Sequence, residues 1–145
     1  MRLSAKTEYA AIAVVELALH DKGRDPVPIR TICAADGVPS RFLVHILLQL
    51  KAAGIVTSTR GASGGYRLAR KPEEITLADV RRAVEGPGDS AAPVTAGLAR
   101  GSRAATALIQ AWDEAFDAEA AALRRVTLAD LAARCRQTAD AMYYI

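Results

Sequence analysis

Two short β-prone runs on either side of a glycine-rich segment constrain the fold of this chain more than any other feature. The runs are residues 55–59 and 66–69, and residues 60–65 between them read Arg-Gly-Ala-Ser-Gly-Gly. β-Branched and aromatic residues favour strands and glycine favours turns, so the pattern predicts a β-hairpin with a flexible basic tip. A nucleotide-binding loop is rejected, because that loop leads from a strand into a helix and carries a Gly-Lys-Ser/Thr ending.

The segment before the hairpin has the apolar spacing of three helices. They are expected over residues 4–22, 28–37 and 40–53, with Ser4 and Ser40 as N-caps and a proline at the first position of the second helix. The short glycine-containing turn between the second and third helices is typical of a helix-turn-helix. Four apolar residues of the third helix share one face and are expected in the core: Leu43, Ile46, Leu47 and Leu50.

The tetrapeptide Thr-Leu-Ala-Asp occurs twice after the hairpin, at residues 76–79 and 127–130. Each copy has the spacing of a capping box, in which the threonine caps a helix and the aspartate reaches back to the threonine backbone. The helices that they open are expected to end at Gly86 and near Asp140.

A long helix is predicted between these two, over about residues 103–125, which corresponds to about 34 Å. A small domain made of the three predicted helices and the hairpin does not need such a long helix for its own core, so we expect the helix to mediate self-association. Residues 87–102 before it are rich in glycine, proline, serine and alanine and are expected to form a loop or linker. The apolar stripe of the long helix is expected to consist of Leu108, Trp112, Ala115, Phe116, Ala122 and Leu123.

The positive charge of the chain is concentrated in one segment. Seven lysines and arginines but only one acidic residue, Asp36, lie between Pro26 and Lys71, in a chain with a formal net charge of +3. Charge alone does not distinguish a solvated basic face from a surface that binds nucleic-acid phosphates. Because the basic segment coincides with the predicted helix-turn-helix and hairpin, DNA binding is the favoured interpretation.

The order of elements predicts a mainly α fold with a small β-hairpin, a winged helix-turn-helix followed by a long dimerisation helix. The expected domains are residues 1–86 as the winged helix-turn-helix DNA-binding domain, 87–102 as a loop or linker, and 103–145 as a helical dimerisation region with a C-terminal tail.

The composition excludes several other classes of protein. The 145 residues are 51% apolar and 24% charged, which fits one soluble domain, and Cys33 and Cys135 do not form the C-x-x-C pair of a zinc site. A signal peptide and an apolar stretch of about 20 residues are both missing, so we expect a cytoplasmic protein that does not bind membranes. His20 and His45 fall on different predicted helices and no catalytic set is apparent, so we expect neither an enzyme nor a cofactor.

The most distinctive segments of the sequence are Met1–Lys6 with Tyr9 and Ala10, Leu50–Val56, the predicted wing Arg60–Ala69, Ile75–Leu77 and Val84–Pro87. In these segments the sequence resembles the Rrf-type family of bacterial winged-helix regulators, the group that includes IscR, NsrR and CymR. This resemblance implies a homodimeric, promoter-binding transcription factor, usually a repressor, with a recognition helix in the major groove and a wing in an adjacent minor groove.

Matching the family's motifs places Arg41, Val44 and His45 at base-reading positions and Arg60 at the wing position that enters the minor groove. Arginine can donate two hydrogen bonds to guanine, histidine can donate or accept, and valine can contact a thymine methyl group. Relatives often carry a small polar residue, Glu and Gln at the three helix positions, so the operator sequence does not transfer. His45 can equally be an ordinary exposed histidine. The expected DNA-binding set is Ser40, Arg41, Val44, His45, Arg60, Gly61 and Arg67.

The chain departs from the iron-sulfur members of the family. Those members carry three cysteines after the fourth helix, whereas residues 87–103 contain none, and Cys33 is expected in the core. The resemblance is therefore to the cluster-free, CymR-like branch. One alternative is a regulator that carries an iron-sulfur cluster or senses redox state or a small molecule, with unusual ligands. The other is a winged-helix protein-interaction module that does not bind DNA.

The C-terminal residues Tyr143, Tyr144 and Ile145 also resemble this branch. There the partner is cysteine synthase, an enzyme whose active site accepts C-terminal isoleucine tails, and backbone N–H groups can hold such a carboxylate. The resemblance thus implies partner binding through the tail and control of cysteine or sulfur metabolism. The alternative is that the three residues pack against the dimer.

Overall fold

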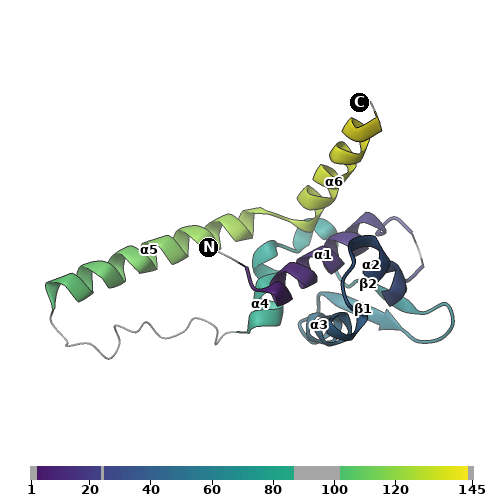
Figure 1. Cartoon of the computed structure of the whole chain (residues 1–145), viewed down its shortest axis with the longest axis horizontal. Helices are drawn as coiled ribbons and strands as arrows, with labels where there is room; N and C mark the ends of the chain where they lie inside the picture. Colours follow the sequence, from purple (N-terminus) through teal and green to yellow (C-terminus); the bar gives the residue numbers. More distant parts are fainter. Residues whose placement is uncertain (1–2, 24, 87–101, 144–145) are drawn as a thin grey trace.

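The computed structural model describes residues 3–23, 25–86 and 102–143 and has a mainly helical winged fold with a long arm (Figure 1). The elements are α1 (Ala5–Leu19), α2 (Ile29–Asp36), α3 (Ser40–Ala52), β1 (Val56–Thr59), β2 (Gly65–Leu68), a short 3-10 helix η1 (Pro72–Glu74), α4 (Leu77–Glu85), α5 (Arg103–Arg125) and α6 (Leu128–Tyr143). This confirms the predicted fold class.

The core lies between α1, α3 and α4 and continues to the start of the hairpin. All four apolar residues predicted on the inner face of α3 are buried. Ile55, Ile75 and Leu128 are also fully buried, so the core includes the entry to the hairpin, the entry to α4 and the first residue of α6. The start of α6 is therefore anchored on the winged part of the molecule.

Several predicted helix ends are wrong by a few residues. Ser40 is the first residue of α3 and not its N-cap, because the extended backbone of Pro39 takes that position. Pro28 is likewise the N-cap of α2 and not its first residue. α1 ends at Leu19 and does not reach residue 22, since His20 has already left helical geometry, whereas α6 continues past Asp140 to Tyr143. The N-cap predicted at Ser4 and the capping box predicted at residues 76–79 are confirmed.

The hairpin is fixed to the helical part by a third backbone segment. β1 and β2 pair antiparallel with Val56 opposite Leu68 and Thr59 opposite Gly65. The backbone of Tyr66 also exchanges two hydrogen bonds with Val27, at 2.8 and 2.9 Å. Gly65 makes this approach possible, because it has a φ of 159° and a Cβ added there would lie 2.3 Å from the Val27 carbonyl oxygen.

The two Thr-Leu-Ala-Asp copies lie side by side. Thr76 and Thr127 form an antiparallel bridge, in which Leu77 N–H donates to the Val126 carbonyl and Leu128 N–H donates to the Ile75 carbonyl, both at 2.9 Å. Both copies form a capping box, and the hydrogen bonds from Thr127 hold the pKa of the Asp130 carboxyl below its usual value. The repeated motif therefore fastens the α5–α6 junction to the start of α4.

The long helix α5 has the predicted bounds but leaves the body of the molecule. Figure 1 shows its first half extending alone, while its C-terminal half approaches α4. No residue of α5 is buried.

Among the described residues, no single helix is long and apolar enough to cross a membrane. Helices α2 and α3 reach the necessary length and apolar composition only when they are taken together, and the chain bends by 119° between them.

A polar network connects this arm to the rest of the chain. The Glu85 carboxylate accepts hydrogen bonds from the hydroxyls of Thr7 (2.5 Å) and Ser4 (3.1 Å) and from Arg81 Nε (2.9 Å). The Arg81 guanidinium also lies 3.1 Å from Glu119 on α5. The Thr7 hydroxyl, followed by Arg81 and Ser4, holds the pKa of the Glu85 carboxyl below its usual value.

We predict that Glu85→Gln lowers the free energy of unfolding at pH 7 by about 1 to 2 kcal/mol, because the charged acceptor of three hydrogen bonds is lost. A lowered pKa in the folded state stabilises the protein above the pKa of the unfolded chain, about 4.3, and this contribution is lost as the pH falls through the folded value. The difference between variant and parent should therefore shrink from pH 7 to pH 4. Urea unfolding at one protein concentration measures it.

The control is Glu73→Gln, since Glu73 is exposed on η1 and this change should cost less than about 0.5 kcal/mol. A Glu85→Gln effect that is equally large at pH 4 would contradict the role given to the carboxylate charge.

Candidate nucleic-acid interface

The outer face of α3 carries the residues predicted to read bases. Burial of the opposite face leaves Arg41, Val44 and His45 exposed, as is the Ser40 side chain at the start of the helix. Arg41 and His45 lie one turn apart, so both can reach the same ligand. The structure thus brings the predicted helix residues together on one surface.

Sequence reasoning missed Leu48 on this surface. Leu48 is 54% exposed and lies one turn after Val44. Its position in the sequence was an available signal, because it falls outside the spacing that places Leu43, Leu47 and Leu50 in the core. Val44 and Leu48 form an apolar strip beside Arg41 and His45, suited to contact methyl groups.

The hairpin carries the remaining predicted residues. Arg60 and Gly61 lie in the exposed turn after β1, and Gly61 has the positive φ of 110° that this turn requires. Arg67 is exposed on β2. α3 and the hairpin lie on the side of the molecule away from α6 (Figure 1). A hydrogen bond of 2.7 Å from Lys51 Nζ to Ser58 Oγ connects the end of α3 to β1.

The basic side chains of this region have no acidic partners among the described residues. The basic member of every ion pair among the described residues is His20, Arg81 or Arg82, and none of these belongs to the basic segment. The seven basic residues predicted to cluster are all exposed: Arg30, Arg41, Lys51, Arg60, Arg67, Arg70 and Lys71. Their positive charge is therefore available to an external anion.

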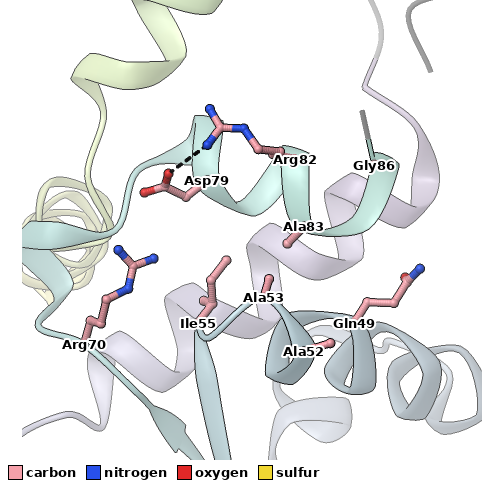
Figure 2. Close-up of a pocket in the computed structure, with 9 residues that line it drawn as sticks. All are labelled: Gln49, Ala52, Ala53, Ile55, Arg70, Asp79, Arg82, Ala83 and Gly86. Atoms are coloured by element: carbon pink, nitrogen blue, oxygen red, sulfur yellow. Dashed lines mark ion pairs between the residues drawn. The ribbon is translucent and has the colours of Figure 1, made fainter. Parts of the chain in front are cut away.

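A cleft of about 650 Å³ lies between the C-terminal end of α3 and α4 (Figure 2). Its middle is formed by Ala53 and Ile55, and Figure 2 shows Arg70 and Gln49 at opposite ends. Asp79 lies 3.9 Å from Arg82 and also closes the capping box of α4. Among the described residues, the polar groups that line the cleft are spread along it and do not converge on one point.

The two cysteines lie on different elements. Cys33 is half-buried against the core on α2, less buried than predicted, and Cys135 is exposed on α6. Within the described ranges, no three His, Cys, Asp or Glu side chains come together in a way that could hold a metal ion.

Comparison with known proteins agrees with this architecture. The chain is 42% identical over 132 residues to the Mycobacterium tuberculosis protein Rv1287, which is named as an HTH-type transcriptional regulator, a match that covers 91% of this chain and 81% of that protein. It is 39% identical over 90 residues to IscR of Aliivibrio salmonicida, covering 62% of this chain and 53% of that one.

Solved structures extend the similarity to the whole fold. CymR, the global cysteine regulator of B. subtilis, superposes with a TM-score of 0.78 at 30% identity and covers 92% of this chain and 98% of its own. IscR of T. potens superposes with a TM-score of 0.77 at 29% identity and covers 95% and 90%. Residues 3–134 match the model of the Rrf2 family, described as "Iron-dependent Transcriptional regulator", and the chain therefore belongs to the Rrf2 family of transcriptional regulators.

Proposed function

We propose that this protein is a homodimeric repressor that binds promoter DNA through the outer face of α3 and the hairpin. The observation that carries the proposal is the set of seven exposed basic side chains on and around these elements, none paired with an acidic residue in the part of the chain that the structure describes. The family consists of transcriptional regulators and not of enzymes, which agrees with the absence of a catalytic motif in the sequence.

In this proposal α3 enters the major groove, where Arg41 donates to guanine and His45 contacts a neighbouring base edge. Arg60 at the hairpin tip enters an adjacent minor groove, where narrow A·T tracts attract a guanidinium. Ser40, Gly61 and Arg67 contact the sugar-phosphate backbone, which fixes the register without reading sequence.

We expect Arg60→Ala to weaken binding to the protein's own upstream DNA and to make the dependence of log K on log salt shallower by about 2, because the homodimer loses one cationic contact from each protomer. Fluorescence anisotropy at several salt concentrations measures both. The matched control is Arg136→Ala on α6, which removes the same charge far from α3 and the hairpin and should leave affinity and slope unchanged.

Equal affinity and slope in Arg60→Ala and the parent would exclude this residue from the interface. If the parent itself binds no DNA at any salt concentration, the protein-interaction module becomes the better account of the fold.

The homodimer part of the proposal rests on α5. Trp112 and Phe116 are 54% and 52% exposed, their ring centroids are 6.2 Å apart, and Leu108 is exposed one turn before them. These residues form one stripe along a helix whose main contact, among the described residues, is with α4. Large exposed apolar patches are rare on monomeric proteins, and a second copy of α5 would cover this stripe with matching residues.

Trp112→Glu should convert the dimer to a monomer, because a carboxylate buried at the centre of an apolar interface loses its hydration without a partner. Sedimentation equilibrium should give about twice 15.3 kDa for the parent and 15.3 kDa for the variant. Gln110→Glu introduces the same charge on the opposite face of α5 and should remain dimeric. Dissociation of both variants, or of neither, would contradict the proposed interface.

The iron in the family description does not fit the donors of this chain. Iron-sulfur clusters are held by several thiolates, and this sequence offers only two cysteines, on helices α2 and α6, with no cysteine or histidine in residues 87–101. The proposal therefore includes no step through iron.

We further propose that the regulated genes belong to cysteine or sulfur metabolism and that cysteine synthase is a partner. The similarity to CymR, the global cysteine regulator of B. subtilis, supports this. The tail proposed to bind the partner consists of Tyr143, Tyr144 and Ile145. The side chains of these three residues are not among those that the structure describes. Deletion of Ile145 should abolish complex formation when cysteine synthase is titrated into the protein, and unchanged binding would contradict the role of the tail.

A further inference from the structure

Three side chains from two helices form a row at the start of the predicted recognition helix. The guanidinium carbon of Arg41 lies over the ring of Phe42, 5.0 Å from its centroid. The Phe42 ring in turn stacks on Tyr9 of α1, with centroids 6.4 Å apart and ring planes inclined by 27°. The row runs from a cation to an exposed ring and then to a ring that packs against the core.

Phe42 is a large apolar residue that the core does not bury. It is 47% exposed, and it belongs neither to the buried face of α3 nor to the polar face that carries His45. Burial in the core therefore does not explain its position. Its contacts with Tyr9 and Arg41 explain the position, because stacking on Tyr9 holds the Phe42 ring beside Arg41 at the surface.

A ring contact restricts the arginine without using its hydrogen-bonding groups. An arginine side chain is long and samples many rotamers, and fixing it on binding costs entropy. The face of an aromatic ring attracts the positive charge of a guanidinium, whereas hydrogen bonds to a base use N–H groups in the guanidinium plane. Arg41 can be held on Phe42 and still donate two hydrogen bonds to guanine.

We infer that Phe42, supported by Tyr9, is a positioning residue that holds the Arg41 guanidinium in place for a guanine in the major groove. The inference rests on the proposed function and adds to it that recognition of this guanine depends on an aromatic ring. Phe42 acts through Arg41, so its loss should reduce discrimination at one base pair and not affinity for DNA in general.

The test first needs the preferred DNA, which is selected from a random duplex library with the full-length protein. Anisotropy then compares the selected duplex with duplexes in which each G·C pair is replaced in turn by A·T. The Arg41→Ala variant identifies the pair that Arg41 reads, since discrimination at that pair is lost. The variants to compare are Phe42→Leu, Phe42→Tyr and the double variant Arg41→Ala/Phe42→Leu.

Phe42→Leu should lower discrimination at the Arg41-dependent pair about two- to fivefold, the range expected for one exposed cation–ring contact, and leave other pairs unchanged. Phe42→Tyr keeps the ring and should restore the parental value. In the Arg41→Ala background, Phe42→Leu should have no further effect. If Phe42→Leu does not melt like the parent, Phe42→Met removes the ring while keeping an apolar side chain and answers the same question.

Three results would overturn the inference: full discrimination in Phe42→Leu, an equal loss at every base pair, or a loss that adds to that of Arg41→Ala. A parent that selects no sequence from the library would contradict the proposed function itself. The two failures are therefore distinguishable.

Discussion

The burial of one face of α3 determines how the rest of the surface is arranged. Leu43, Leu47 and Leu50 are fully buried between α1 and α4, and they prevent the helix from rotating about its axis. Rotation would expose these residues at a cost of about 1.5–3 kcal/mol each. The packing of the buried face of α3 is therefore what orients Arg41 and His45 towards solvent.

The same core connects this surface to the proposed dimer arm. Leu128 at the start of α6 is buried with the α3 residues, and the backbone bridge between Thr76 and Thr127 fixes the α5–α6 junction beside α4. The pair Arg81–Glu119 adds a charged contact from α4 to α5. Two such arms joined along α5 would set the distance between two recognition helices, which is how a dimeric regulator matches the spacing of its half-sites.

Periodicity and capping residues in the sequence are sufficient to predict most of the helices and the hairpin. Single-residue shifts such as Pro39 in place of Ser40 as the N-cap of α3 were not predictable, because both residue types suit a helix start. The bridges Val27–Tyr66 and Thr76–Thr127 join segments far apart in the chain, and local patterns carry no information about them. At the site, Leu48 was visible in the spacing, whereas the contact of Arg41 with Phe42 depends on the three-dimensional placement of Tyr9.

The most direct test of the account is to titrate the purified, metal-free protein into its own upstream DNA and into a scrambled fragment of equal length and composition. Fluorescence anisotropy at several salt concentrations would report both affinities. Tighter binding to the upstream fragment, with an affinity that falls steeply as salt rises, is the predicted result. Equal, weak binding to both fragments would contradict the claim that α3 and the hairpin of this protein read an operator without a cofactor.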